Sequence, residues 1–208
     1  MRPGSWRLVP TPTKILQPDG SYKHVRQLLC ATDLGLDALI LFDTDLSELD
    51  RSYVPEGHGP RHTIFSPCGR YAYTVNELIS GITVSEFDGK HLTTLDTVSS
   101  LPEDFDGISY GAAIRLTADG RHLYCTNRGH DSIAHFAVDG TKVTLLETVD
   151  CGGSWPRDFN MSPDERFIVC TNERGNNVTV YSRNPVDGKL TRLPQTIEMP
   201  TPLAAVFG

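Results

Sequence analysis

Residues 59 to 77 read GPRHTIFSPCGRYAYTVNE. Two runs in which apolar and polar residues alternate flank the turn sequence SPCG, and a period of two is typical of β-strands. An Arg-His pair begins the first run, and an Asn-Glu pair ends the second. The stretch therefore predicts a β-hairpin that carries polar side chains at its open end.

The hairpin recurs along the chain. Residues 111–136 (GAAIRLTADGRHLYCTNRGHDSIAHF) and 156–180 (PRDFNMSPDERFIVCTNERGNNVTV) are further copies, and residues 30–42 (CATDLGLDALILF) are a partial one. The shared anchor positions are 43, 51 and 45 residues apart, and they are Asp33, Asn76, Asn127 and Asn172. Repeats of roughly 40 to 50 residues are typical of β-propeller blades.

Each unit reads as four short strands, which in the second unit are RHTIF, YAYTV, ITVSEF and HLTTLDTV. Asp-Gly pairs between later strands supply the positive φ that tight hairpins need. No stretch has a helical period. We therefore expect an all-β fold, a β-propeller of four-stranded antiparallel blades with about four blades over residues 28–208. Residues 1–27 are expected to form an irregular or damaged start of the first blade.

This strand order gathers polar side chains on one face. Alternate connections of an antiparallel sheet lie on the same side, and the innermost strand of a blade lines the central channel. The residues expected near the channel mouth are Arg61, His62, Arg157 and Asp158, with Asn76, Glu77, Asn127 and Arg128 beside them.

Composition excludes several classes of function. The 208-residue chain has a formal net charge of −7, which argues against a general nucleic-acid binder and a basic membrane patch. The sequence contains no run of 18 apolar residues, so we expect no membrane-spanning helix. The chain has five cysteines, which is an odd number, and no two of them have CxxC spacing. This pattern predicts neither a disulfide framework nor a zinc site, and it favours a reduced chain in the cytoplasm. We expect no metal and no cofactor.

The segments GPRHTIFSPCGRYAYTVNEL, DGRHLYCTNRGHDSIAHF and GGSWPRDFNMSPDERFIVCTNERGNNVTVY resemble the lactonase family of seven-bladed propellers. That family includes propeller-type 6-phosphogluconolactonases and fungal carboxymuconate cyclases. The resemblance runs from about Leu28 to the end, where MPTPLAAVFG is similar to the closing strand of the family. It implies a hydrolase of the pentose phosphate pathway that acts on a small anionic lactone or sugar phosphate.

The chain departs from the family pattern in three places. About four units stand where the family has seven. Arg26 replaces the second histidine of a His-x-His-Gln start, and part of the strand that should follow is missing. Ala112-Ala113-Ile114 stands where the family often carries a carboxylate on an inner strand. We therefore expect that truncation weakens the activity.

The resemblance and the residue types suggest roles in opening a lactone. His62 is a candidate general base because imidazole titrates near working pH, and Asp158 is the alternative base. Arg61 and Arg157 occupy the same place in two units, and their guanidinium forks suit phosphate or carboxylate. The other candidate substrate-binding residues are Asn76, Glu77, Asn127, Arg128 and His130, of which Arg128 and His130 suit phosphate.

Each assignment has a structural alternative. His62 could hydrogen-bond within the channel wall, and the arginines could bridge blades to backbone carbonyls. Asp158 could pair with Arg157 or Arg128. The recurring asparagines could cap the connections that they begin, a role that their recurrence favours.

Three functions remain open. The leading hypothesis is a metal-independent 6-phosphogluconolactonase-like hydrolase. A carboxymuconate-type lactonising cyclase needs the same arginines and acid or base. The third is a non-catalytic propeller fragment or interaction module, because fold alone does not give chemistry. An incomplete ring also leaves open blade edges, through which the chain could self-associate.

Overall fold

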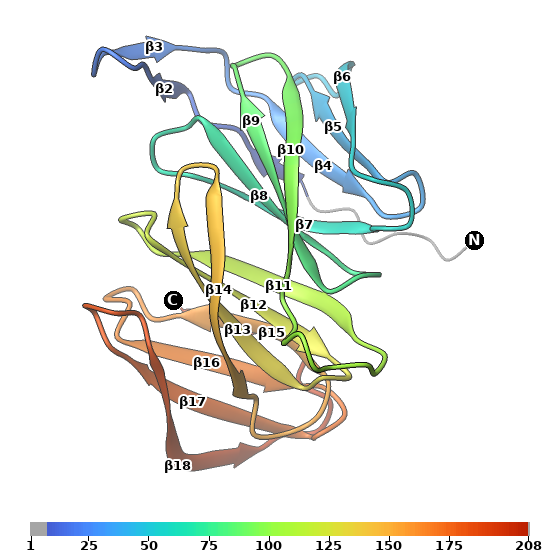
Figure 1. Ribbon diagram of the computed structural model, residues 1–208, viewed down its shortest axis with the longest axis vertical. Coiled ribbons are helices and arrows are strands. Elements are labelled where there is room, and N and C mark those ends of the chain that lie inside the picture. Colours follow the sequence, from blue (N-terminus) through green and yellow to red (C-terminus); the bar gives the residue numbers. More distant parts are fainter. Residues whose placement is uncertain (1–7, 208) are drawn as a thin grey trace.

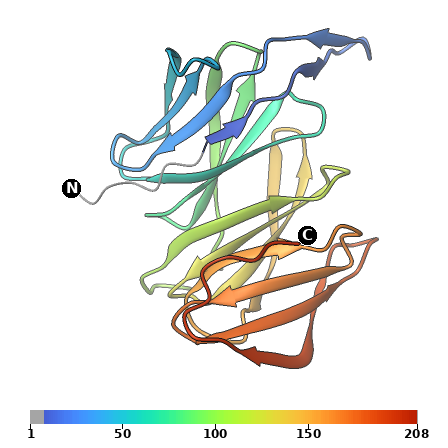
Figure 2. The ribbon, with the colours of Figure 1, turned by 180° about the vertical axis from the view of Figure 1, so that it is seen from behind.

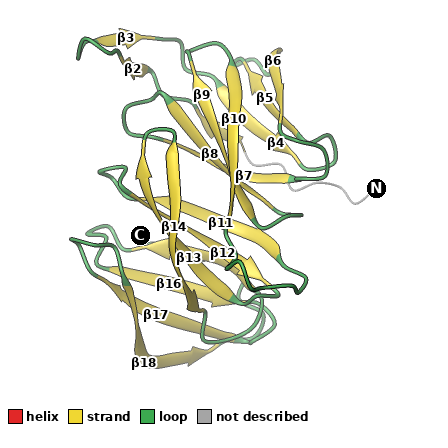
Figure 3. Cartoon of the chain, viewed as in Figure 1, coloured by secondary structure: helices red, strands yellow, loops and turns green. Residues whose placement is uncertain are grey.

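The computed structural model describes residues 8–207, which form eighteen strands and no helix (Figures 1 and 3). The first sheet holds β1 (Leu8–Pro10), β4 (Leu29–Asp33), β5 (Ala38–Phe42) and β6 (Glu48–Tyr53). The second holds β7 (Pro60–Phe65), β8 (Tyr71–Asn76), β9 (Gly81–Phe87) and β10 (Leu92–Ser99). The third holds β11 (Tyr110–Leu116), β12 (His122–Arg128), β13 (Ser132–Asp139) and β14 (Lys142–Asp150). The fourth holds β15 (Pro156–Met161), β16 (Phe167–Asn172), β17 (Asn177–Arg183) and β18 (Leu190–Glu198), and β2 (Lys14–Leu16) pairs with β3 (Tyr22–His24).

These four antiparallel sheets confirm the predicted propeller-like architecture. Within the second, third and fourth sheets, consecutive strands are neighbours, so each predicted repeat forms one meander. The first strands of these sheets, β7, β11 and β15, run side by side as the inner strands. The ring is not closed, because the first and fourth sheets lie at opposite ends of the arc (Figures 1 and 2).

Apolar clusters between neighbouring sheets hold the arc together. Tyr73 and Val84 of the second sheet pack with Phe136 of the third, and Tyr124 of the third packs with Phe159 of the fourth. All are at most 1% exposed. Burying each such side chain contributes about 1.5–3 kcal/mol, so the alternating pattern of the strands stabilises both the sheets and their stacking.

Two of the three recurring asparagines, Asn127 and Asn172, tie one sheet to the next, whereas Asn76 bonds within its own sheet. Asn127 donates from Nδ2 to the carbonyl of Ser100 at 2.9 Å and accepts from the Ser100 hydroxyl at 2.6 Å. Asn172 donates to the carbonyl of Cys151 at 3.1 Å, and Asn76 donates to Thr83 at 2.7 Å. The three asparagines are fully buried, and none of these bonds caps the backbone of the connection that the asparagine begins, so their role is structural but differs from the predicted cap.

The first sheet is built differently from the expectation for residues 1–27. His24 ends the exposed β2–β3 hairpin, so the His24–Gln27 segment does not form an inner strand. Instead β1 pairs with β4 and takes the inner place. The hairpin packs on the second sheet through buried Ile15 and through a backbone hydrogen bond of 2.9 Å from Leu16 to Cys68.

Two histidines lie buried side by side in the third sheet. Nδ1 of His122 is 3.0 Å from Nε2 of His135, and the His135 ring stacks on Tyr124 with a centroid distance of 4.8 Å. Burial lowers the pKa of both, the neighbouring imidazole further lowers that of His135, and nearby Arg183 acts in the same direction. Glu147 opposes the shift at His135, with Oε1 at 3.4 Å from Nδ1.

The histidine pair predicts a loss of stability in mild acid. Because the folded protein binds these protons more weakly than the unfolded chain, the stabilisation is complete above the ordinary histidine pKa of about 6.5. It is lost progressively as the pH falls below that value. We expect the melting temperature to decrease by several degrees from pH 7.5 to 5.5, measured by circular dichroism.

His122→Gln should reduce this dependence on pH, whereas His91→Gln, at a site 59% exposed, should leave it unchanged. A melting temperature that falls equally in all three proteins would show that the buried pair is not the cause.

Candidate functional site

The inner strands share one local irregularity. The pairing register shifts between Pro60 and His62 in β7, and between Pro156 and Asp158 in β15. Arg61 and Arg157 are therefore the extra residues of two β-bulges at equivalent places. Bulges redirect side chains and are common beside active sites. The third inner strand shifts in the same region, between Gly111 and Ile114.

Glu77 joins two arginines from neighbouring sheets. Its Oε2 lies 3.3 Å from Nε of Arg61, and its Oε1 lies 3.0 Å from Nη2 of Arg128. The side chains of both arginines are 7% exposed and that of Glu77 is 23% exposed. Burial and then Arg128 lower the pKa of Arg61 to about 10, although Glu77 raises it. Two guanidinium groups share one carboxylate, which leaves a positive charge to attract an anion.

Backbone carbonyls of β11 hold the same two arginines. Arg61 donates from Nη1 to the carbonyl of Ala112, and Arg128 donates from Nη2 to that of Gly111 at 3.1 Å. Gly111 also donates to the carbonyl of Glu77 at 3.0 Å. A Cβ at residue 111 would lie 2.4 Å from the carbonyl oxygen of Asn76, so this approach requires glycine.

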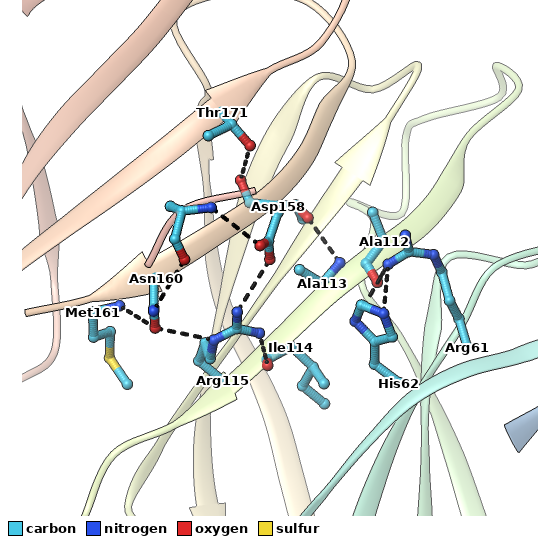
Figure 4. Close-up of polar contacts among 12 residues, drawn as sticks. Arg61, His62, Ala112, Ala113, Ile114, Arg115, Asp158, Asn160, Met161 and Thr171 are labelled. Carbon is cyan, nitrogen blue, oxygen red and sulfur yellow. Dashed lines mark hydrogen bonds and ion pairs between the residues drawn. The ribbon is translucent and has the colours of Figure 1, made fainter. Parts of the chain in front are cut away.

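His62 lies against Arg61 (Figure 4). Nη1 of Arg61 is 3.2 Å from Nε2 and 3.3 Å from Nδ1 of the imidazole. Because a guanidinium only donates, the nitrogen that accepts from it needs a lone pair, which a neutral imidazole offers. A neutral imidazole has only one such nitrogen, so His62, which is partly exposed, takes a proton from water only when Arg61 releases that nitrogen.

Asp158 pairs with a residue that the sequence pattern did not indicate. Its Oδ1 lies 3.1 Å from Nη2 of Arg115, and its Oδ2 accepts from the backbone nitrogen of Ala205 at 3.3 Å. Arg157 instead pairs with Glu173, at 3.2 Å. The alternative pairings of Asp158 with Arg157 or Arg128 are therefore wrong. Both carboxylate oxygens of Asp158 are engaged, which favours a structural role over that of a base.

The two halves of this region face each other across β11. Figure 4 shows Arg61 and His62 on one side of Ala112 and Ala113, and Asp158 on the other. Arg157 is near enough to lower the pKa of Arg61, and Asp158 to raise it. Between the two halves, β11 places the methyl groups of Ala112 and Ala113, while its charged residue Arg115 pairs with Asp158.

A tryptophan in a strained conformation borders the region. Trp155 has a φ of 64°, in the left-handed range that costs a bulky residue free energy. Its ring lies between two guanidinium groups, with Arg174 Cζ 3.4 Å and Arg128 Cζ 5.5 Å from the centroid. Tyr110 lies 5.9 Å away, centroid to centroid. The aromatic ring therefore helps to position Arg128.

The remaining predicted residues are placed as follows. His130 lies near the same end, with Nδ1 2.7 Å from the hydroxyl of Ser132 and its ring edge-on to Phe105. Asn76 and Asn127 have no exposed surface for a substrate, so the structure favours a structural role for both. Among residues 8–207, no three His, Cys, Asp or Glu side chains gather as a metal site would require. No helix there could span a membrane.

The sequence pattern indicated several residues of the candidate site but missed the residues that contact them. Arg115, Glu173 and Trp155 were not singled out, although each contacts a residue that was. The sequence SWPRD contained a usable signal. Trp155 directly precedes the Pro-Arg pair that begins an inner strand, and in the second repeat Gly59 has this position before Pro60. Arg115 gave no such signal, because its partner lies in the next repeat.

Comparisons with known proteins agree with the propeller fold. The chain is 39% identical over 184 residues to the 6-phosphogluconolactonase of Bacillus subtilis, which covers 85% of this chain and 53% of the relative. The structure of a periplasmic gluconolactonase from Pseudomonas aeruginosa matches with a TM-score of 0.78 and 32% identity, covering 91% of this chain and 54% of that one. A Lactobacillus plantarum protein matches with a TM-score of 0.82 and 31% identity, covering 92% and 66%.

The chain spans about half the length of the curated relatives it matches. The family model described as "Lactonase, 7-bladed beta-propeller" matches residues 18–207. This chain therefore belongs to the seven-bladed β-propeller lactonase family.

Proposed function

We propose that this chain opens a lactone ring by hydrolysis, as a carboxylic ester hydrolase of the 6-phosphogluconolactonase type. The observation that carries the proposal is the pair of buried guanidinium groups, Arg61 and Arg128, that share Glu77 beside His62. Such a group attracts an anionic substrate and supplies positive charge where a carbonyl oxygen gains negative charge. The identity to the Bacillus subtilis enzyme supports the same class of reaction.

The proposed reaction has two steps. His62 takes a proton from water as the water oxygen attacks the carbonyl carbon, and Arg61 stabilises the oxyanion that forms. The bond from that carbon to the ring oxygen then breaks, and the imidazolium returns the proton to the departing oxygen. The product is a hydroxy acid, and no electrons enter or leave. We propose a metal-independent route because side chains supply both the base and the positive charge.

Arg157 is the proposed contact for the phosphate of the substrate. Its side chain is 37% exposed, whereas those of Arg61 and Arg128 are 7% exposed, so it is accessible to the outer end of a ligand. Its partner Glu173 lies at 3.2 Å and would need to yield to the phosphate. Arg128 and His130 lie toward the same end of the sheets and could contact a second phosphate oxygen.

The proposal includes a cytoplasmic setting in the pentose phosphate pathway. All five cysteines are free thiols, which suits a reducing compartment. Burial raises the pKa of the Cys30, Cys125 and Cys151 thiols to about 12, so these thiols are unreactive.

Hydrolysis of 6-phosphogluconolactone by the purified chain tests the function. We expect acid release above the spontaneous rate, followed with a pH indicator in weak buffer. His62→Ala and Arg61→Ala should each lower kcat by about 100-fold or more, because each removes a group that acts in the transition state. Arg70→Ala, at a partly exposed salt bridge with Glu86 on the same sheet, is the matched control and should not change the rate.

Acid release no faster than the spontaneous rate, from protein that melts cooperatively, would overturn the hydrolase proposal. If that protein closed carboxymuconate to its lactone, the cyclase hypothesis would replace the hydrolase proposal. If neither reaction occurred, the hypothesis of a non-catalytic fragment would replace it.

Arg157→Ala should separate binding from chemistry. If this side chain holds the phosphate, the variant should raise KM for 6-phosphogluconolactone about tenfold with little change in kcat. Steady-state rates with gluconolactone, which lacks phosphate, should be the same in variant and wild type. An equal loss with both lactones would instead assign Arg157 to the reacting carbonyl or to the fold.

A further inference from the structure

A cavity of about 470 Å³ lies between the first and second sheets, away from the candidate site. Its walls are the β2–β3 hairpin with the segment that follows it, the start of β6, and the β9–β10 turn, which lie together at one end of the arc (Figure 1). The turn follows the end of β9, whereas Glu77 precedes the start of that strand, so the cavity and the candidate site are on opposite faces. Its volume is within the range of about 300–1,000 Å³ that is typical of small-molecule sites.

One side of the cavity is apolar. Leu28 is 3% exposed and Val25 is half-buried. Gly89 lies directly against Val25, because a Cβ at this glycine would be 2.5 Å from Cγ1 of the valine. Leu49 is the extra residue of a bulge in β6 and is 50% exposed. Since bulges redirect side chains, this leucine lines the cavity instead of packing against a cross-strand partner.

Basic side chains predominate among the polar residues that line the cavity. They are Lys23 and His24 of β3, Arg26 of the following segment, and Lys90 and His91 of the β9–β10 turn. Asp88 also lines the cavity, but its Oδ1 accepts from the backbone nitrogens of Lys90 and His91 at 2.7 and 2.8 Å, so its own turn engages it. The chain as a whole carries 26 acidic residues against 19 lysines and arginines, so this is a local concentration of basic residues.

Two of the basic groups are held against the walls of the cavity. Arg26 forms an ion pair with Asp43, whose side chain is 11% exposed, so its guanidinium is fixed beside the end of β5. Nζ of Lys23 donates to the carbonyl of Asp88 at 3.4 Å, which joins the hairpin to the β9–β10 turn. These contacts shape the cavity before a ligand enters, and such preorganisation lowers the cost of binding.

The β9–β10 turn supplies a charge that is available to a ligand. Nδ1 of His91 lies 3.2 Å from Oδ1 of Asp50, so this imidazole already has a carboxylate partner. The ammonium group of Lys90 and the imidazole of His24 instead make no hydrogen bond or ion pair with residues 8–207. Lys90 therefore offers an unpaired cation next to the apolar side of the cavity.

We propose that this cavity binds a small organic anion that carries a carboxylate on an aromatic or branched aliphatic body. The carboxylate contacts Lys90, which orients the ligand, and the body packs on Val25, Leu28 and Leu49. Removal of that apolar surface from water drives the binding. Inorganic phosphate has no surface to place on the apolar side, so it binds here poorly. The site does not depend on the proposed hydrolysis of a lactone.

The fluorescence of 8-anilinonaphthalene-1-sulfonate tests the site, because this probe joins a sulfonate to an aromatic body and brightens in apolar surroundings. We expect saturable binding to the folded chain. 1-Naphthoate should displace the probe, whereas 1-naphthalenemethanol, which lacks the charge, and inorganic phosphate should need concentrations about tenfold higher or more. The absence of saturable binding, or displacement by the alcohol or by phosphate as effective as that by naphthoate, would overturn the proposal.

Matched substitutions locate the bound probe. Lys90→Gln removes the unpaired cation and Leu49→Asn removes apolar surface, so each should weaken probe binding about fivefold or more. The first control is Lys189→Gln, at the equivalent Asp-Gly-Lys turn of the fourth sheet. The second is Leu146→Asn, at the bulge of β14, where the leucine is 51% exposed. Both controls should bind the probe as the wild type does. If all four variants fold by circular dichroism and bind with equal affinity, this cavity is not the site.

Discussion

Glu77 holds together two buried cations that would otherwise repel each other, and the candidate site depends on this contact. Arg61 comes from the inner strand of the second sheet, and Arg128 from the end of β12 in the third. The carboxylate at the start of the β8–β9 connection contacts both. It therefore couples the packing of two sheets to the charge at their shared end. The carboxylate of Glu77 pairs with both guanidinium groups and so offsets the cost of burying them.

The backbone makes this contact possible. A bulge at Arg61 aims its side chain along the end of the sheets, and glycine at 111 lets β11 approach the end of β8. The equivalent bulge at Arg157 does the same one sheet further on, with Ala112 and Ala113 between. The inner strands thus place arginines on both sides of the fully buried Ala112 and Ala113, and positive charge arranged in this way suits a compact anionic ligand.

The fold was predictable from the sequence because its signals are local. Alternation, Asp-Gly turns and recurring asparagines lie within each repeat, and the four-stranded sheets follow from them. The candidate site was predictable only in part. Arg61, His62 and Glu77 belong to one hairpin, whose open end brings them together. The pairing of Asp158 with Arg115 and the inner place of β1 were not predictable, because each depends on contacts between repeats that no local pattern encodes.

The stability of Glu77→Gln tests the central contact most directly. Removing the carboxylate leaves two buried guanidinium groups facing each other, so urea unfolding should show a loss of about 2–4 kcal/mol. Inorganic phosphate should restore part of this loss by binding between them. Glu86→Gln breaks a partly exposed pair with Arg70 and should cost under about 1 kcal/mol. If Glu77→Gln were as stable as Glu86→Gln and did not respond to phosphate, the bridge would not organise the site.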